Sequence, residues 1–195
     1  MRTVDHISDD ALMSAFIAGD TAAMEALFDR HRQAVFGWIR HHVSDSAEAE
    51  DMYHDVWLRI IRQAQSYRPG GFRAWMWRIV RNCTIDHARK MRPELTLDGA
   101  ANVANPDGET LIDTIPDESA VHALTGMEAV ERRTAVTAAI DALSPPLKEV
   151  VLLRIQGELE FREIAAQLGL PLGTVLARMH NAVEKLKRNL AGKGE

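Results

Sequence analysis

Apolar residues between Ala49 and Ala64 recur at intervals of three and four positions, which is the spacing of one buried face of an α-helix. Acidic residues occupy the first turns of this predicted helix and arginines the later ones. That order suits the helix dipole and leaves a patch of carboxylates on the solvent side. The segment Pro69-Gly70-Gly71 then interrupts the helix, because proline cannot continue one and paired glycines do not favour one. The expected buried face comprises Ala49, Met52, Tyr53, Val56, Trp57, Ile60, Ile61 and Ala64.

A second, strongly basic helix is predicted from Phe72 onward. Nine arginines and lysines lie between Arg59 and Arg92, with a single acid, Asp86. Trp77 is expected among the arginines, away from the apolar face of the helix, and an aromatic ring beside cationic groups is typical of surfaces that bind single-stranded nucleic acid. A solvated cationic face with Trp77 packed against a neighbouring segment is equally consistent, since tryptophan is highly buried on average. The expected apolar face comprises Phe72, Trp75, Met76, Ile79, Val80 and Cys83.

Two further helices are predicted before this pair. A short helix is expected over residues 9–19, and Asp20 or Thr21 can cap the next helix, which extends to about Val43. Together with the central pair, these helices predict a compact helical domain over residues 1–92. The buried face of the longer helix is expected to comprise Met24, Leu27, Phe28, Val35, Trp38, Ile39 and Val43.

Residues 93–126 are expected to form an acidic flexible linker, because turn-forming residues and carboxylates accumulate there without a Lys or Arg. A second small helical domain is predicted over residues 127–195. Its first helix is expected over Met127–Leu143, and Ser144 and Pro145 are the predicted cap and first residue of the next helix. The positions expected to be buried in that next helix are Leu147, Val150, Val151 and Ile155.

The segment 161–175 has the pattern of a helix, a turn containing Gly169, and the start of another helix, which predicts a helix-turn-helix. Pairs of short helices are common in proteins, so the glycine turn and the basic first domain are what favour DNA binding over a purely structural role. The second helix is expected to turn Val175, Met179, Val183, Leu186 and Leu190 inward.

Composition and charge place limits on the function. The chain has 195 residues, of which 46% are apolar and 26% charged, as in an ordinary globular protein of one or two domains. No apolar run reaches the length of a membrane span and the first residues do not lead into a signal peptide, so we expect a cytoplasmic protein without membrane insertion. The net charge of −5 argues against strong autonomous DNA binding, but positive charge is concentrated in residues 59–92 and 178–193. This distribution favours a weak DNA binder that needs a larger partner.

The sequence does not contain the residue patterns of an enzyme. Its single cysteine, Cys83, excludes an internal disulfide and a paired-cysteine zinc site, and the eight histidines do not follow a zinc-binding pattern. There is no glycine-rich phosphate loop, nucleophile–base pair or dinucleotide fingerprint. We therefore expect no catalysis, no cofactor and no bound metal.

The run from Ala49 to Arg92 resembles the second conserved region of the extracytoplasmic-function sigma factors, bacterial initiation factors that recruit RNA polymerase to promoters. The helix-turn-helix segment resembles a second block of the same family in the expected order, and the likeness extends from about Asp10 to Leu190. The resemblance implies an all-α protein of two small helical domains joined by an acidic flexible linker. It also implies that the protein binds core RNA polymerase, directs promoter recognition and melting, and has an anti-sigma factor as a partner. The linker would thread toward the polymerase active-site cleft and the RNA exit channel.

The resemblance also assigns site residues. Contacts to core polymerase are expected from Glu50, Asp51, His54, Asp55 and Arg59. The downstream promoter element is expected to meet Tyr67, Arg68, Trp77, Arg78, Arg81 and Asn82, with Asn82 and the loop 66–71 capturing a base flipped out of the non-template strand. The upstream element is expected to meet Thr174, Ala177, Arg178, Asn181, Lys185 and Arg188.

Some positions depart from the pattern of the family. Leu176 and Ala177 stand where Lys and Ser are common, Asn181 where arginine is frequent, and Glu160 where a capping Ser is expected. His54 and Asp55 stand where Gln and Glu are usual.

The less basic recognition helix keeps open a second hypothesis, a sigma-like decoy that binds an anti-sigma factor without initiating transcription. A free-standing dimeric helix-turn-helix repressor is a third hypothesis, although the sequence offers neither a dimerisation surface nor a ligand pocket for it.

Overall fold

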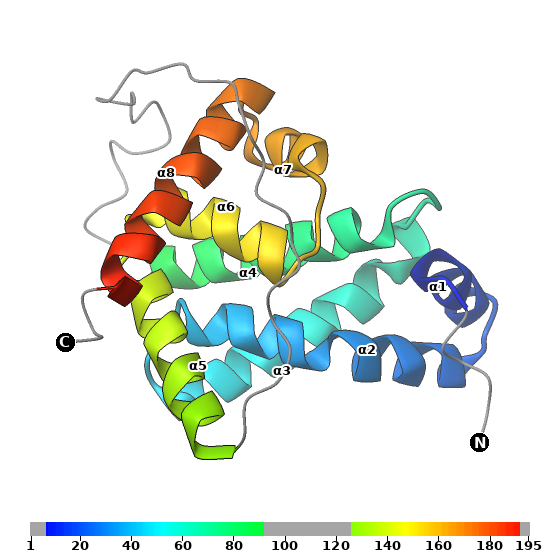
Figure 1. The fold of residues 1–195 in the computed structure, drawn as a ribbon. Coiled ribbons are helices and arrows are strands. Elements are labelled where there is room, and N and C mark those ends of the chain that lie inside the picture. Colours follow the sequence, from blue (N-terminus) through cyan, green and yellow to red (C-terminus); the bar gives the residue numbers. More distant parts are fainter. Residues whose placement is uncertain (1–6, 92–125, 192–195) are drawn as a thin grey trace.

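The structure, a computed structural model, describes residues 7–91 and 126–191. All regular secondary structure in these two ranges is helical, as the apolar spacing predicts (Figure 1). Apart from Gly126, the predicted acidic linker lies outside the described residues. The first group of helices is α1 (Asp9–Ile17), α2 (Thr21–Arg40), α3 (Ser46–Gln63), the 3₁₀ turn η1 (Ala64–Ser66) and α4 (Phe72–Met91). The second group is α5 (Gly126–Asp141), α6 (Pro145–Ile155), α7 (Phe161–Leu168) and α8 (Leu172–Ala191).

Local sequence signals set most of the helix ends. The carboxylate of Asp20 caps α2 by accepting a hydrogen bond from the Ala22 N–H at 3.0 Å, so Asp20 rather than Thr21 is the cap. Pro145 is the first residue of α6, where its missing N–H costs no hydrogen bond. The helix α2 ends at Arg40, three residues before the predicted end at Val43, which is nevertheless buried.

The core of the first group forms where α2, α3 and α4 meet. Trp38 of α2 is fully buried, its ring centroid lies 5.4 Å from that of Trp77, and its indole N–H donates to the Thr84 hydroxyl at 3.4 Å. On α3 and the start of η1, the predicted buried face is confirmed at six of eight positions: Ala49, Met52, Val56, Trp57, Ile60 and Ala64. Tyr53 is half-buried, and Ile61 is 44% exposed in an open hollow that it lines with Met24 and Phe28 of α2.

The second group contains the predicted helix-turn-helix. Gly169 ends α7 with φ +66°, a left-handed conformation that glycine adopts without steric cost, and α8 begins three residues later. Val175 is fully buried, and α8 packs against α5, α6 and α7. Ile155 and Leu190, both expected inside, are 57% and 39% exposed because they lie in the last turns of their helices.

The two groups pack directly on each other: α7 contacts α4, and a side chain of α6 reaches α4. Their buried apolar residues form one continuous cluster. Ion pairs cross the contact between Arg81 and Glu149 at 2.6 Å, between Arg73 and Glu158, and between His41 and Asp141 at 2.8 Å. None of the helices in the described parts of the chain is both long and apolar enough to cross a membrane.

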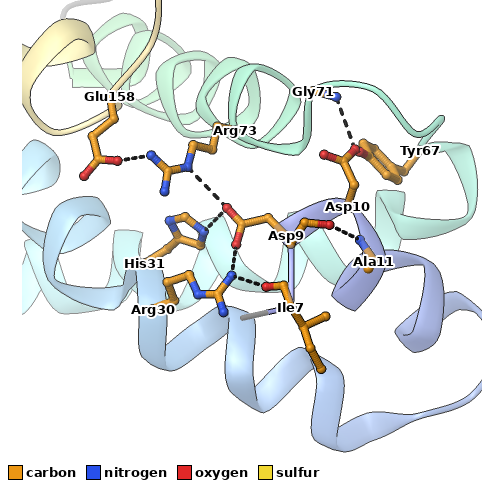
Figure 2. Close-up of polar contacts among 11 residues, drawn as sticks. Ile7, Asp9, Asp10, Ala11, Arg30, His31, Tyr67, Gly71, Arg73 and Glu158 are labelled. Carbon is orange, nitrogen blue, oxygen red and sulfur yellow. Dashed lines mark hydrogen bonds and ion pairs between the residues drawn. The ribbon is translucent and has the colours of Figure 1, made fainter. Parts of the chain in front are cut away.

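A buried carboxylate joins three helices of the first group. Asp9, 9% exposed, accepts hydrogen bonds from Arg30 and, at 3.0 Å, from His31 of α2, and from Arg73 of α4 at 3.3 Å (Figure 2). Burial alone would raise the pKa of Asp9, but the bonds to His31, Arg30 and Arg73 outweigh it and hold this pKa well below its usual range.

We expect Asp9→Asn to lower the free energy of unfolding at pH 7 by about 3–5 kcal/mol, the typical cost of removing one partner from a buried ion pair. Because the folded-state pKa of Asp9 is lowered, its contribution is complete above the unfolded pKa of about 3.9 and is lost as the pH falls below that value. Urea unfolding between pH 3 and 7 should therefore show a constant gap in the free energy of unfolding above about pH 4 and a gap that begins to narrow below it.

The control is Asp29→Asn, at a carboxylate whose side chain is 71% exposed, and this variant should follow the wild type throughout. A gap between Asp9→Asn and the wild type that stays constant with pH would show that the charge of Asp9 is not what stabilises the fold.

Candidate nucleic-acid interface

The acidic end of α3 presents most of its predicted contact residues to solvent. Glu50, Asp51, His54 and Asp55 are all exposed, and they lie within two turns of one helix. Arg59, the fifth predicted member, is instead held by an ion pair with Asp86 of α4 at 3.0 Å, although 37% of its side chain remains exposed. The structure therefore brings four of these residues together on one open surface.

Two apolar residues that the sequence did not assign to a site extend this acidic surface. Leu58 is 46% exposed and Ile61 is 44% exposed. Glu50, His54, Leu58 and Ile61 follow one another at intervals of three and four along α3, so they form a single exposed stripe. An exposed apolar stripe beside charged groups is typical of a protein–protein contact. The helical spacing of apolar residues in the sequence had predicted that Ile61 lies in the core.

The basic helix α4 presents three of the residues predicted for the downstream element. Arg78 and Asn82 are exposed one turn apart on the same side of the helix, and Arg68 is exposed in the loop that precedes α4. An asparagine amide can donate and accept hydrogen bonds together, which suits the edge of a base, and the two arginines supply charge for phosphates.

Trp77 does not lie on this basic surface, which corrects the expectation from the sequence. Its side chain is buried, with the residue only 1% exposed, and its ring packs edge-to-face against Trp38. The alternative that Trp77 packs against a neighbouring segment is the correct one, with α2 as a packing partner. In this arrangement of the chain, no face of the indole is available for stacking on a base.

Two more predicted contacts are held inside the protein. Tyr67 is 3% exposed, with its ring packed edge-to-face on Trp75 at 5.1 Å and its hydroxyl bonded to Asp10. Arg81 is half-buried, and its guanidinium is paired with Glu149 of α6. Neither feature could be read from periodicity, because the partners lie 57 and 68 residues away in the sequence.

The loop before α4 is fixed by a residue that the sequence did not single out as functional. The carboxylate of Asp10 accepts hydrogen bonds from the Gly70 N–H and from the Tyr67 hydroxyl. It also accepts one from the Gly71 N–H (Figure 2). Acidic residues near a helix start are common, so the two aspartates that open α1 are the only sign of this contact in the sequence.

The recognition helix α8 carries the residues predicted for the upstream element along one stripe. Thr174, Ala177, Arg178 and Asn181 are half-buried, whereas Lys185 and Arg188 near the end of the helix are exposed. The more exposed stripe of α8 runs through Leu176, 40% exposed, and His180.

Glu160 precedes α7 as its cap, and its N–H donates to the Glu163 carboxylate at 2.8 Å. The start of α7 is therefore capped although Glu160 replaces the Ser expected there.

Comparison with known proteins identifies the family. Residues 27–93 match the family model for Sigma-70 region 2, and residues 133–186 match that for Sigma-70 region 4. The chain is 30% identical over 177 residues to the ECF RNA polymerase sigma factor SigE of Mycolicibacterium smegmatis, covering 89% of this chain and 65% of SigE. It is 29% identical over 178 residues to the ECF RNA polymerase sigma factor SigW of Bacillus subtilis, covering 88% of this chain and 91% of SigW.

The chain belongs to the extracytoplasmic-function sigma factors. It is therefore related to transcription factors for promoter recognition rather than to enzymes. Its fold is also that of CnrH, solved in complex with the cytosolic domain of CnrY, with a TM-score of 0.64, 22% identity, and coverage of 94% of this chain and 97% of CnrH.

In this sigma factor, region 2 corresponds to α2–α4, and region 4 corresponds to α5–α8, which include the helix-turn-helix. Within residues 7–91 and 126–191, no group of three or more His, Cys, Asp or Glu side chains is arranged to hold a metal ion.

We expect Trp77→Ala to lower the free energy of unfolding by about 3–5 kcal/mol, because it leaves a large cavity beside Trp38. Trp77→Phe keeps an aromatic ring in the same space and should cost clearly less. Denaturant unfolding followed by circular dichroism measures both values. If the free energy of unfolding of Trp77→Ala lies within about 0.5 kcal/mol of the wild-type value, the usual range for surface substitutions, Trp77 is not part of the core.

Proposed function

We propose that this sigma factor is a transcription initiation factor that binds core RNA polymerase through α3, reads the downstream promoter element with α4 and its preceding loop, and reads the upstream element with α8. The observation that carries the proposal is the separation of two exposed surfaces on one small domain. An acidic and apolar face lies on α3 and a basic face with Asn82 lies on α4. The matches to Sigma-70 regions 2 and 4, and the relatives named as RNA polymerase sigma factors, support it.

The α3 face has the composition of a docking surface. Its carboxylates complement a basic partner surface, and the exposed Leu58 and Ile61 add apolar area that a partner can cover. Burying such residues at the centre of a contact supplies affinity, while the surrounding charges steer association. We assign this surface to core RNA polymerase.

The exposed face of α4, which does not include the buried Trp77, has the composition of a nucleic-acid-binding surface. Arg68 and Arg78 are placed to neutralise phosphates, and Asn82 is placed to read a base edge. Arg81 joins them only if its pair with Glu149 is replaced by a phosphate. A partly exposed ion pair contributes about 1 kcal/mol or less, so this exchange costs little.

The α8 helix is assigned to the upstream element. Arg178 is its best candidate for base readout, since a bidentate arginine–guanine contact discriminates by about 1–3 kcal/mol, and Lys185 and Arg188 are placed for phosphates. The exposed Leu176 can contact a thymine methyl group.

The partner that holds such a factor inactive is assigned to the anti-sigma class by the resemblance, and CnrH has been solved in complex with the cytosolic domain of CnrY.

Run-off transcription with purified core polymerase tests the proposal. The wild-type protein should direct specific transcripts from a mixture of promoters. The double variant Asp51→Lys/Asp55→Lys should bind core at least about tenfold more weakly, because like-charge contacts at an interface cost several kcal/mol. Circular dichroism should show unchanged helicity, since both side chains are exposed.

The matched control is Glu25→Lys/Asp29→Lys, which makes the same charge change at exposed positions of α2. It should retain core binding. Wild-type protein that binds core but yields no specific transcript would point to the decoy, whereas tight duplex binding without core would point to the repressor. Equal losses in the two double variants would mean that net charge, not the α3 surface, governs core binding.

We expect Asn82→Ala to reduce the rate of open-complex formation while core binding persists. On a template opened artificially across the melted region the defect should remain, because the lost contact reads the base rather than separating the strands. Permanganate footprinting on closed and pre-opened templates measures both steps. Gln33→Ala removes an exposed amide from α2 and serves as the control. Full recovery of Asn82→Ala on the open template would assign Asn82 to strand separation.

A further inference from the structure

Three hydrogen bonds from one loop converge on a single oxygen of Asp10. Its Oδ1 accepts from the Gly70 N–H at 2.8 Å and from the Tyr67 hydroxyl. It also accepts from the Gly71 N–H at 3.2 Å (Figure 2). Asp10 lies in the first turn of α1, and the loop of residues 66–71 joins η1 to α4. The conformation of this loop is therefore held by a contact with α1, which lies about sixty residues earlier in the sequence.

The two glycines make the backbone of this loop flexible, so a contact from outside the loop is needed to hold it in one conformation. Gly70 and Gly71 have φ values of +118° and +143°, which residues with a side chain rarely adopt, and an added Cβ at either would meet nothing within 4 Å. The glycines are thus required by conformation rather than by space. Glycine also loses more conformational entropy than any other residue when it is ordered, so an untied pair would sample several conformations.

The Asp10 side chain can bind the loop because neighbouring residues cap α1 and form the ion pairs with α2 and α4. Ser8 caps α1 by accepting from the Ala11 N–H at 3.2 Å, and the Asp9 side chain is occupied by Arg30, His31 and Arg73. Burial alone would raise the pKa of Asp10, but the bonds from Tyr67 and from the loop amides outweigh it and lower this pKa, so the acceptor is an anion at neutral pH. Bonds from N–H groups to an anion are about twice as strong as neutral ones.

Tyr67 anchors the other side of the loop. Its ring is buried against Phe72 and Trp75 at centroid distances of 6.0 and 5.1 Å, and its N–H donates to the Ala64 carbonyl at 3.0 Å. The loop is therefore held at Tyr67 by packing and at Gly70 by Asp10. Only Arg68, Pro69 and Gly70, all exposed, are left at its tip to meet a ligand.

We propose that Asp10 is a positioning residue for base recognition at the downstream element. It holds the backbone of residues 66–71 in the single conformation that receives the unpaired base beside Asn82, and so determines which base is accepted. This inference rests on the proposed function of the loop and adds a residue that touches no DNA itself. A loop released from Asp10 still offers its tip to DNA, but its donors and acceptors no longer match one base edge better than another.

The test compares four pre-opened promoters that differ only at the unpaired base, transcribed by core polymerase with the wild type, Asp10→Ala or Asp10→Asn. For Asp10→Ala, the ratio of transcription rates between the best and the worst base should fall about tenfold, which corresponds to about 1.4 kcal/mol of lost discrimination. Asp10→Asn should give a smaller loss, because its amide keeps one neutral acceptor oxygen. Asp20→Ala removes the cap of α2 and is the control; it should leave the ratio unchanged.

Amide hydrogen exchange at Gly70 and Gly71 reports on the loop independently of transcription. Both amides should be protected in the wild type and should exchange at least about tenfold faster in Asp10→Ala, since their acceptor is gone. Tyr67→Phe, which removes only the hydroxyl, provides a milder variant if Asp10→Ala does not fold, and it should reduce the base ratio in the same direction.

A variant that transcribes all four templates more slowly but in the wild-type ratio would overturn the inference, and so would unchanged exchange at both glycines. Wild-type protein that gives no specific transcript would instead refute the proposed function. The two failures are therefore distinguishable in one set of reactions.

Discussion

The burial of α4 between two groups of helices is the constraint on which the rest of the structure depends. Phe72, Met76 and Val80 of this helix join the apolar core, and Trp77 meets Trp38 of α2. Arg73 and Arg81 are paired with Glu158 and Glu149 of the second group. A helix that is covered on so much of its circumference has a narrow exposed face, and Arg78 and Asn82 lie on it. The surface proposed to bind nucleic acid is thus the part of the basic helix that packing leaves exposed, not the whole basic sequence.

The same packing gives each side of the first group a separate task. The helix α3 has one face in the core and an open acidic and apolar face, while α4 exposes cationic and amide groups. Two links between these helices, Arg59 with Asp86 and His87 with Glu48, lie between the two surfaces. The proposed function, in which a large protein partner and DNA are bound at once, requires contact surfaces of different chemistry, because one surface cannot complement both.

The contact between the two groups combines strong and weak contributions. The apolar cluster is continuous across it, and burial of apolar area is the main favourable contribution to such packing. The crossing ion pairs are partly exposed and contribute about 1 kcal/mol or less each. Their main effect is therefore on the register of the two groups and on which charges remain available to a ligand.

The sequence by itself determined the helices, several of their boundaries and the family. Asp20, Pro145 and Gly169 act within one turn of their own positions, so local chemistry sufficed to place the starts of α2 and α6 and the end of α7. The exposed positions of Glu50, Asp51, His54 and Asp55 were also predictable, since a polar residue opposite an apolar stripe has nowhere else to go.

The tertiary structure decided how wide each buried face is and which residues meet across the chain. Periodicity gives the direction of an apolar face but not the number of neighbours that cover it, which is why Ile61 is exposed and Trp77 buried against expectation. The bonds of Asp10 to Tyr67 and Gly70 join residues about sixty positions apart, and no local pattern encodes such a pair. Hydrogen bonds at that separation form only after the helices have packed, so the shape of the loop of residues 66–71 is a property of the folded domain.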